Sequence, residues 1–437
     1  MREKVFEVRE FDVIAGVDGC AGTRYLEPPH FDELMRFVKE FSPSEEGDSD
    51  AMQFFKVGAK RGAVDTLSVR NYVGLIETPT RKQIQILPKI DFSNGDGDLS
   101  ATKAIFLRML RSLRQFSSKA LGTARLDTSR MSLFEIFIAM YLREAEALVK
   151  RGLRSDYVPV EEDLPALRGR LILKEQLSRN LTHKERFAVR HDEYLLDRPE
   201  NKIVKSTLLK LREATADPSN KRDAIRLLSH FEMVSPSSNV DADLSKCSPD
   251  RSTAAYRTLI AWSRVFLKNR SFTTFSGESG AKSLLFPMHT LFESYVAREM
   301  AKAYSPVGWS VRAQDQSYRL FDDPSMFRLK PDIVVKRGDG HTVILDTKWK
   351  SLCPNQRENY GISQGDVYQM YAYSKKYKTR DVFVLYPLNN EMRGHQPIDF
   401  RELDAGGNAT VHVRIRFVDL EHMDASLNEI RQQIESL

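Results

Sequence analysis

The chain has 437 residues, 41% of them hydrophobic, with a formal net charge of +6. This length is typical of two or three domains, and the hydrophobic content indicates folded cores rather than a disordered chain. The N-terminal segment is charged, the most apolar helical segment is interrupted by Glu135, and the three scattered cysteines have no metal-binding spacing; we therefore predict a cytoplasmic protein without a signal peptide, membrane span, membrane partner or zinc finger.

Residues 1–100 are rich in predicted strands. Apolar and alternating segments predict strands within 4–16, 54–62, 65–78 and 82–90. One helix is expected at 31–41, and a glycine-rich linker at 91–101 ends the segment. This segment contains 13 Lys and Arg and 18 Asp and Glu, a net charge of −5. Because of this acidic charge, the small barrel or sandwich is expected to contact a protein rather than DNA.

Residues 101–280 are mainly helical by their apolar periodicity, with a loop expected at 235–250. The segment carries 32 Lys and Arg against 22 Asp and Glu, a net charge of +10. Such an excess favours contact with a phosphate backbone. Arg168, Arg170 and Lys174 are the candidate DNA-binding residues, and the alternative, a strand with solvated basic side chains, stays open.

Residues 281–437 alternate helices and strands. A helical period runs through 283–306, followed by an expected strand at 310–320 and a hairpin at 328–352. A second helix is predicted at 365–377, and the apolar run 381–387 predicts a buried strand. The order is therefore helix, three strands, helix, strand.

The hairpin RLKPDIVVKRGDGHTVILDTKWKSL contains two aspartates and a lysine within its strands, although aspartate is a poor strand former. A turn centred near Asp339 places Asp332 opposite Asp346. Opposed residues on antiparallel strands point to the same face. Lys348 lies two residues beyond Asp346 and shares that face. The register thus predicts two carboxylates and one ammonium side by side.

Two carboxylates at such a separation repel each other unless a cation lies between them. Mg²⁺ suits such a pair because it takes one or two carboxylates and completes its shell with water and phosphate oxygens. The lysine would orient or deprotonate an attacking water, or stabilise charge on the phosphorus. A half-exposed salt bridge without catalysis is the alternative, and the residues leave it open.

The order of elements and the residues Pro331-Asp332 and Asp346-Thr347-Lys348 resemble the PD-(D/E)xK nuclease fold. By that resemblance Asp332 and Asp346 hold the metal, Mg²⁺ or Mn²⁺ in its place, and Lys348 serves the water. Gln369 and Tyr373 match the supporting Q-x-x-x-Y helix of the RecB-like branch, although ordinary helix packing is an equal alternative for this pair. Glu293 resembles a first-helix acid that some members use as a further ligand, although a solvated glutamate is an equal alternative.

An ordered set of segments resembles a narrower family. These segments are YVGLIETPTRKQIQILPKI, LRGRLILKEQ, HDEYLLDRPENKIVKSTLLKL and LLFPMHTLFESYV, followed by the nuclease motif. Together they are similar to McrC, the endonuclease subunit of McrBC-type modification-dependent restriction systems. The resemblance implies double-stranded DNA containing methylated cytosine as substrate. It also implies a AAA+ GTPase of the McrB kind as partner, whose hydrolysis this chain stimulates.

The sequence contains no G-x-x-x-x-G-K-[ST] motif, so we expect no nucleotide to be bound by this chain itself. We predict a multidomain α+β protein with a partner-docking β-rich domain at 1–100, a helical basic domain at 101–280 and a nuclease domain at 281–437. Two alternatives stay open: a self-sufficient repair or defence nuclease, and a non-catalytic activator of a partner NTPase.

Overall fold

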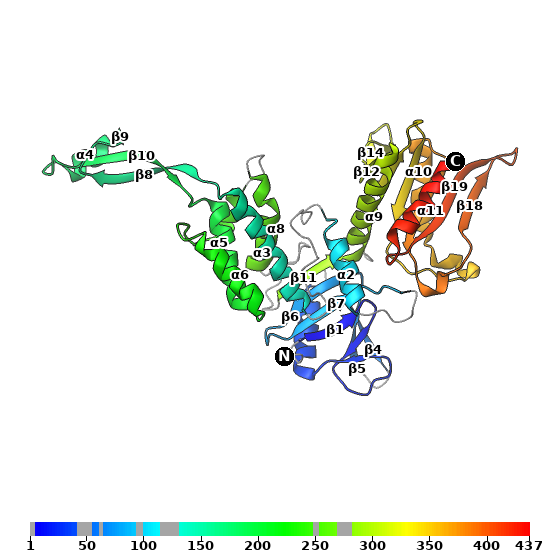
Figure 1. Ribbon diagram of the computed structural model, residues 1–437. Coiled ribbons are helices and arrows are strands. Elements are labelled where there is room, and N and C mark those ends of the chain that lie inside the picture. Colours follow the sequence, from blue (N-terminus) through cyan, green and yellow to red (C-terminus); the bar gives the residue numbers. More distant parts are fainter. Residues whose placement is uncertain are drawn as a thin grey trace. The chain divides into compact units, whose positions relative to one another are not determined.

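A computed structural model describes residues 5–41, 55–60, 64–92, 99–113, 131–247, 253–268 and 282–437. Residues 93–98, most of the predicted linker, lie outside these ranges. The chain divides into two compact units, the first comprising residues 1–117, 127–132 and 271–437, and the second comprising 118–126 and 133–270. Figure 1 shows the helices and strands of both units along the chain.

The N-terminal part of the first unit contains two four-stranded sheets. One has the order β1-β7-β6-β11 and the other the order β3-β2-β5-β4. The strands are β1 (Val5–Arg9), β2 (Val13–Ala15), β3 (Arg24–Tyr25), β4 (Phe55–Lys60), β5 (Val64–Val69), β6 (Tyr72–Glu77), β7 (Gln83–Leu87) and β11 (Lys282–Pro287). The helices are α1 (Pro28–Phe41) and α2 (Leu99–Leu110).

Strand β11 adds residues from the second half of the chain to the N-terminal sheet. It pairs antiparallel with β6, from Lys282 opposite Glu77 to Pro287 opposite Tyr72. At Gly74 the backbone φ is +135°, and a Cβ there would lie 1.9 Å from the carbonyl oxygen of Leu284. Only glycine permits this close approach. The N-terminal sheet is therefore completed by residues beyond the predicted boundary at 281.

The C-terminal part of the first unit is built on a six-stranded sheet of order β12-β15-β16-β17-β19-β18. Strands β16, β17 and β19 are parallel to one another, and the other pairs in this sheet are antiparallel. The strands are β12 (Ser310–Ala313), β15 (Ile333–Lys336), β16 (Thr342–Thr347), β17 (Asp381–Pro387), β18 (Ile398–Leu403) and β19 (Ala409–Val418). A separate pair is β13 (Arg319–Phe321) with β14 (Met326–Arg328).

Three helices pack on this sheet (Figure 1). Helix α9 (Met288–Tyr304) contacts β12 and β16, and α11 (Met423–Glu435) contacts β19 and α9. Helix α10 (Gln364–Tyr377) contacts β16, β17 and β19, where its Met370 and Tyr373 join the buried core. Burial of these apolar side chains is the main stabilising contribution to the domain.

The second unit combines a helical bundle with a strand arm. The helices are α3 (Leu133–Arg151), α5 (Pro199–Ala214), α6 (Pro218–Ser229), α7 (Val240–Lys246) and α8 (Arg257–Lys268). The arm consists of β8 (Asp156–Leu164), β9 (Arg170–Leu171), α4 (Leu173–Arg179) and β10 (Phe187–Leu195), with the sheet order β8-β10-β9. Among the described residues, no helix is both long enough and apolar enough to cross a membrane.

Three predicted elements differ from the structure. The helix expected at 283–306 begins at Met288, because Lys282–Pro287 form strand β11, which pairs with β6. The expected loop at 235–250 contains α7, which begins after Asn239, whose side chain accepts a hydrogen bond from the backbone N–H of Ala242. The expected strand at 310–320 is interrupted. It forms β12 in the large sheet and then β13 in a separate hairpin, with Gln314 at φ +52° between them. The remaining architecture is multidomain α+β, as predicted.

Candidate active site

The hairpin of β15 and β16 has the predicted register. Ile333 lies opposite Leu345 and Lys336 opposite Thr342. One step further along this register places Asp332 opposite Asp346, at the end of the hairpin away from its turn. Asp346 also lies beside Val384 of β17, a residue of the core that packs against α10. The Asp346 side chain therefore lies on the α10 face of the sheet.

The buried aspartate and the partly exposed lysine of the D-T-K motif form an ion pair. Lys348 Nζ lies 2.8 Å from Asp346 Oδ2, and Asp346 is only 1% exposed. The backbone N–H of Lys348 donates to the carbonyl of Leu385 at 2.9 Å, which extends the pairing of β16 with β17 by one residue. The ammonium is thus held by its own backbone and by its carboxylate partner.

Helix α10 supplies the other contacts of this ammonium. Lys348 Nζ donates to Gln369 Oε1 at 3.1 Å, and Gln369 Nε2 donates to the Tyr373 hydroxyl at 2.7 Å. Asp366 Oδ1 lies 3.7 Å from the same Nζ. The structure therefore joins the predicted Q-x-x-x-Y pair to Lys348. Sequence reasoning missed Asp366, although its spacing of three residues from Gln369 places both on one helix face.

Asp332 is fixed by the residue between the motif positions. Its Oδ2 accepts hydrogen bonds from the Thr347 backbone N–H and from the Thr347 hydroxyl, both at 2.7 Å. Burial raises the pKa of Asp332, and these two hydrogen bonds and Lys348 oppose the increase. Because Thr347 uses only Oδ2, these bonds leave Oδ1 of Asp332 for another ligand.

Burial also raises the pKa of Asp346, to about 7, with a further contribution from Asp332 and opposition from Lys348. Burial and the charge of Asp332 raise the pKa of Glu293 on α9 to about 7, and a hydrogen bond from the Gln314 side chain opposes this increase. For Lys348 burial lowers the pKa, but Asp346 and its neighbours outweigh this effect and raise it. The charge of Asp332 thus raises the pKa of both Asp346 and Glu293, while Lys348 opposes the increase for all three carboxyl groups and Lys330 also opposes it for Glu293.

The chemistry of these donors fits a hard divalent cation. Raised carboxyl pKa values mean that the negative charge is poorly compensated, and a divalent ion would compensate it. Glu293 is therefore a member of the acidic group that the sequence suggested. Burial lowers the pKa of His289, one turn earlier on α9; Asp332 opposes this decrease and Lys348 adds to it. Sequence reasoning missed His289, although its spacing of four residues from Glu293 places both side chains on one face of the helix.

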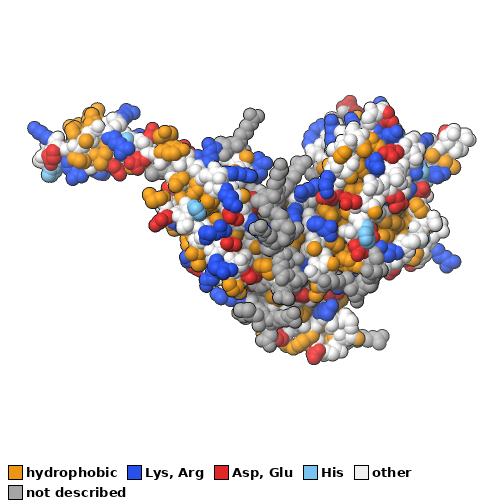
Figure 2. All heavy atoms as spheres, viewed as in Figure 1, with side chains coloured by type: hydrophobic (Ala, Val, Ile, Leu, Met, Phe, Trp, Pro, Cys, Tyr) orange, Lys and Arg blue, Asp and Glu red, His pale blue; other side chains and the backbone are white. Residues whose placement is uncertain are grey.

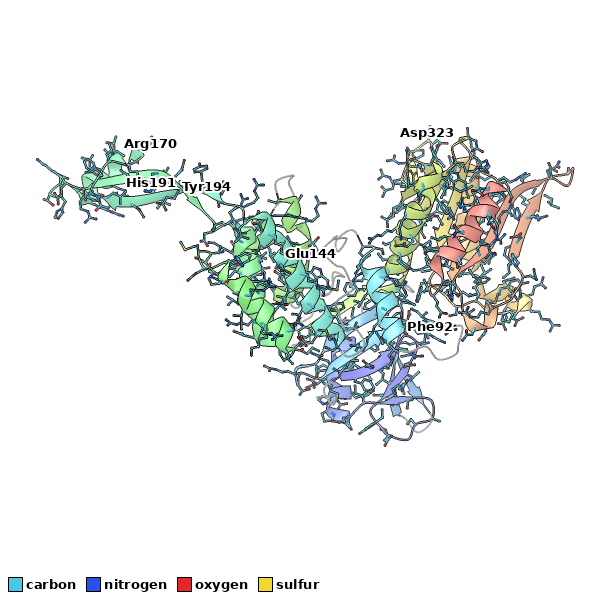
Figure 3. All side chains as sticks on the ribbon, viewed as in Figure 1. Phe92, Glu144, Arg170, His191, Tyr194 and Asp323 are labelled. Atoms are coloured by element: carbon cyan, nitrogen blue, oxygen red, sulfur yellow. The ribbon has the colours of Figure 1, made fainter. Side chains whose placement is uncertain are left out.

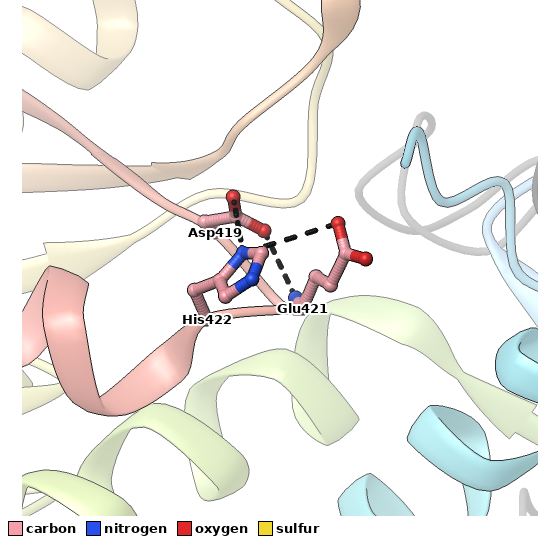
Figure 4. A group of neighbouring side chains, drawn as sticks. All are labelled: Asp419, Glu421 and His422. Carbon is pink, nitrogen blue, oxygen red and sulfur yellow. Dashed lines mark hydrogen bonds and ion pairs between the residues drawn. The ribbon is translucent and has the colours of Figure 1, made fainter. Parts of the chain in front are cut away.

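A second acidic group lies outside this site (Figure 4). Among the described residues, Asp419, Glu421 and His422 form the one trio of ligand atoms that all lie within 4.8 Å of one another. Asp419 already binds Arg393, with Oδ2 3.1 Å from Nη1, and it accepts the backbone N–H of Glu421 at 2.9 Å. Because a guanidinium neutralises Asp419, this trio fits a structural role better than a metal site.

The predicted DNA-binding residues lie on the arm of the second unit, where Figure 3 labels Arg170. Arg170 pairs with Arg190 of β10 in register. Arg168 Nη1 lies 3.7 Å from Glu193 Oε1, and Lys174 lies on α4. Gly169 between the two arginines has φ +75°, and a Cβ there would lie 2.4 Å from the Arg190 carbonyl oxygen. This glycine therefore allows β9 to approach β10.

The arm also exposes large apolar side chains, some of which are visible in Figure 2. Leu173, Leu177 and Leu181 recur every four residues, at 68%, 63% and 68% exposure. Tyr157 and Tyr194 are paired in register, 68% and 65% exposed, with ring centroids 5.0 Å apart. Exposed apolar groups at such density mark surfaces that bind other molecules.

Comparison with known proteins identifies a matching family and solved structures with a similar fold. The family model described as "McrBC 5-methylcytosine restriction system component" matches residues 67–387. A chain of the Thermococcus gammatolerans assembly of McrB AAA+ hexamers with bound McrC has TM-score 0.65 and 20% identity, over 98% of this chain and 100% of that chain. A chain of the Thermococcus gammatolerans McrBC complex has TM-score 0.50 and 19% identity, over 68% and 88% of the two chains. Among curated proteins, none matches this sequence.

Proposed function

Because the chain belongs to the family of McrBC 5-methylcytosine restriction system components, we propose that it is the DNA-cleaving subunit of such a system. In this proposal it hydrolyses phosphodiester bonds in double-stranded DNA containing methylated cytosine. The observation that carries the proposal is the group of Asp332, Asp346 and Lys348 on one face of the β15–β16 hairpin, in which Lys348 Nζ lies 2.8 Å from Asp346 Oδ2.

Asp332 and Asp346 are the groups that would hold Mg²⁺ or Mn²⁺, and Glu293 of α9, whose pKa the charge of Asp332 raises, is the candidate for a further ligand. When bound, the ion supplies Lewis-acid stabilisation of the phosphoryl oxygens and a more acidic water. Thr347 holds Asp332 by two hydrogen bonds and fixes which oxygen is free. The raised pKa values of Asp346 and Glu293, both about 7, mean that protons compete with the metal below neutral pH.

Lys348 acts in this proposal as a fixed positive charge. Its pKa is raised by Asp346 and neighbouring carboxylates despite its burial, so the ammonium is protonated at neutral pH and is a poor base. A protonated lysine instead stabilises the negative charge that develops on the phosphorus oxygens in the transition state. Gln369 orients the ammonium at 3.1 Å, and Tyr373 holds Gln369 at 2.7 Å.

The partner in this proposal is a AAA+ GTPase of the McrB kind. This chain has no phosphate-binding loop motif, so nucleotide hydrolysis would belong to the partner, and this chain would stimulate it. One solved assembly with this fold consists of McrB AAA+ hexamers with bound McrC, which supports such a pairing.

Two parts of the chain are candidates for docking on the partner. The sequence suggested residues 1–100 from their acidic charge. The arm offers a more specific observation, because Leu173, Leu177 and Leu181 are each more than 60% exposed. In residues 1–100 the large exposed apolar side chains among those described are less exposed: Phe11, Val17, Tyr25, Val57 and Leu99, at 44%, 52%, 42%, 45% and 39%. We therefore place the docking surface on the arm.

The experiment that tests the proposed function compares methylated and unmethylated plasmid, with Mg²⁺ and GTP, in the presence and absence of the partner GTPase. We expect cutting only of methylated plasmid and only with the partner. Equal cutting by the isolated chain would support a self-sufficient nuclease instead. Stimulated GTP hydrolysis without any cutting would support the non-catalytic activator.

A further inference from the structure

A hydrogen bond within the first unit joins the N-terminal sheet to the residue that follows Lys348. The indole Nε1–H of Trp349 donates to the carboxylate of Glu10, at 2.9 Å from Oε2 and 3.1 Å from Oε1. Glu10 lies 339 residues earlier in the chain, directly after β1, and is 1% exposed. The bond is therefore a partly buried contact between segments that are far apart in the sequence.

The Glu10 carboxylate is held by several strands of the N-terminal sheet. Its own backbone N–H donates to the carbonyl of Leu87 at the end of β7, at 2.9 Å. Its carboxylate also accepts from the backbone N–H groups of Lys89 and Asn71. The carbonyl of Asn71 in turn accepts from the N–H of Met288, the first residue of α9, at 2.8 Å. The sheet and the start of α9 therefore converge on one carboxylate.

Trp349 connects this carboxylate to two parts of the candidate active site. It directly follows Lys348, whose Nζ binds Asp346 at 2.8 Å. Its ring packs on Phe292 of α9, with centroids 5.4 Å apart, and Phe292 directly precedes Glu293. A shift of the indole would therefore move the backbone of Lys348 and disturb the turn of α9 that carries Glu293.

The acceptor of the Trp349 indole N–H is an ionisable side chain, that of Glu10. Burial raises the pKa of Glu10 to about 7, although the hydrogen bond from Trp349 opposes the increase. An indole N–H needs only an acceptor, which a neutral amide or a backbone carbonyl supplies without the cost of burying an ionisable group. A glutamine at this position would therefore still accept the indole N–H, whereas an alanine would leave it without this acceptor.

We propose that Glu10 is a positioning residue of the nuclease, which acts through Trp349 to hold the Lys348 ammonium against Asp346. The inference rests on the proposed function and adds to it that the N-terminal sheet is part of the cleavage machinery. The Glu10 side chain itself touches neither substrate nor metal ligand in this account. Its effect is on the fraction of time for which Lys348 is correctly placed.

The test uses the full chain assembled with its partner GTPase, and measures the single-turnover rate of plasmid cleavage and the half-saturating DNA concentration. Trp349→Phe keeps an aromatic ring against Phe292 and removes only the N–H donor. We expect the rate to fall about tenfold to a hundredfold, as expected for loss of a hydrogen bond to a charged group, with an unchanged half-saturating DNA concentration. Glu10→Ala should behave in the same way, and Glu10→Gln, which keeps an acceptor oxygen, should restore most of the rate.

A matched control is Asp91→Ala. Asp91 also joins the N-terminal part to the C-terminal domain, because its Oδ2 accepts from the backbone N–H of Asn390 at 3.1 Å. Among the described residues, its hydrogen bonds are to Asn390 and Arg393 and not to Trp349 or Lys348. Its variant should cleave at the wild-type rate. Partner GTP hydrolysis should stay stimulated in every variant, because none of these residues lies on the arm.

Two results would overturn this inference. The first is wild-type cleavage by Trp349→Phe, and the second is a Glu10→Gln variant as slow as Glu10→Ala. A Lys348→Ala variant separates this inference from the proposed function. If Lys348→Ala cleaves normally, the proposed function itself fails. If Lys348→Ala is inactive while Trp349→Phe is fully active, only the role of Glu10 is refuted.

Discussion

Replacement of Asp346 by asparagine should make the metal-free protein more stable at neutral and alkaline pH. The pKa of Asp346 rises from 3.8 to about 7 on folding, mainly through burial. Because its folded pKa lies above its unfolded pKa, the group contributes stability below about pH 4 that is lost as the pH rises to about 7. Asparagine keeps the shape of the neutral acid and does not ionise.

The size of the effect follows from that shift. Each pKa unit corresponds to about 1.36 kcal/mol, so ionisation of Asp346 with a shift of roughly three units destabilises the folded state by about 4 kcal/mol above pH 7, relative to the neutral acid that is present below pH 4. The assay is denaturant unfolding of the wild type and of Asp346→Asn in EDTA, at pH 4 and at pH 8. We expect similar stabilities at pH 4 and a more stable variant at pH 8.

The opposite result would refute this reasoning. If Asp346→Asn is less stable than the wild type at pH 8, the ion pair with Lys348 at 2.8 Å stabilises the fold. Asp346 would then be one half of a structural salt bridge, which is the alternative that the sequence left open. A stability gain that appears only without metal would show that the site trades stability for ion binding.

Three further predictions concern the metal, the lysine and the arm. Mg²⁺ at a hundredfold excess over its Kd should stabilise the wild type by about 2.7 kcal/mol, and the effect should weaken as the pH falls below about 7, the pKa of Asp346 and Glu293; calorimetry that shows equal Mg²⁺ binding at pH 5 and pH 8 would contradict it. Lys348→Ala should slow cleavage about 10²-fold to 10³-fold, the cost typical of one lost electrostatic donor, with Mg²⁺ affinity retained by titration; loss of Mg²⁺ binding instead would argue for a structural lysine. Leu177→Glu should weaken partner binding and GTPase stimulation, measured by sedimentation and phosphate release, whereas Ile225→Glu, an exposed apolar residue on α6, should change neither; equal losses in both would refute docking through the arm.

The register of the β15–β16 hairpin could be predicted from the sequence because local rules determine it. The apolar, β-branched runs at 333–336 and 342–347 predict two strands, and the glycine-containing turn between them fixes their pairing. The pairing of Ile333 with Leu345 follows directly. The buried strand 381–387 was equally predictable, because its apolar run has no competing helical period.

The arm was not predictable in the same way. Strand β8 reads DYVPVEEDL, and its proline and three acidic residues in succession do not alternate as a half-buried strand should. Its stability depends on pairing with β10 over nine residues, a contact between segments more than 20 residues apart. The helix α7 was missed because Leu244 is its only buried residue, which gives no apolar period.

The site was predicted where its residues share a motif and missed where they meet only in space. Asp332, Asp346 and Lys348 lie on adjacent strands, so spacing predicts their common face. The contact of Glu10 with Trp349 joins positions 339 residues apart, and nothing in either local sequence indicates the other. The same holds for β11, which pairs with β6 although the two strands lie more than 200 residues apart in the sequence.

The most direct test of the central claim is a paired measurement on Asp346→Ala assembled with the partner GTPase. One readout is cleavage of methylated plasmid with Mg²⁺, and the other is stimulation of GTP hydrolysis in the same sample. The account predicts that cleavage is lost while stimulation is retained, because the β15–β16 site and the docking arm belong to different units of the chain. Wild-type cleavage by Asp346→Ala would contradict the claim that the paired aspartates form the catalytic centre.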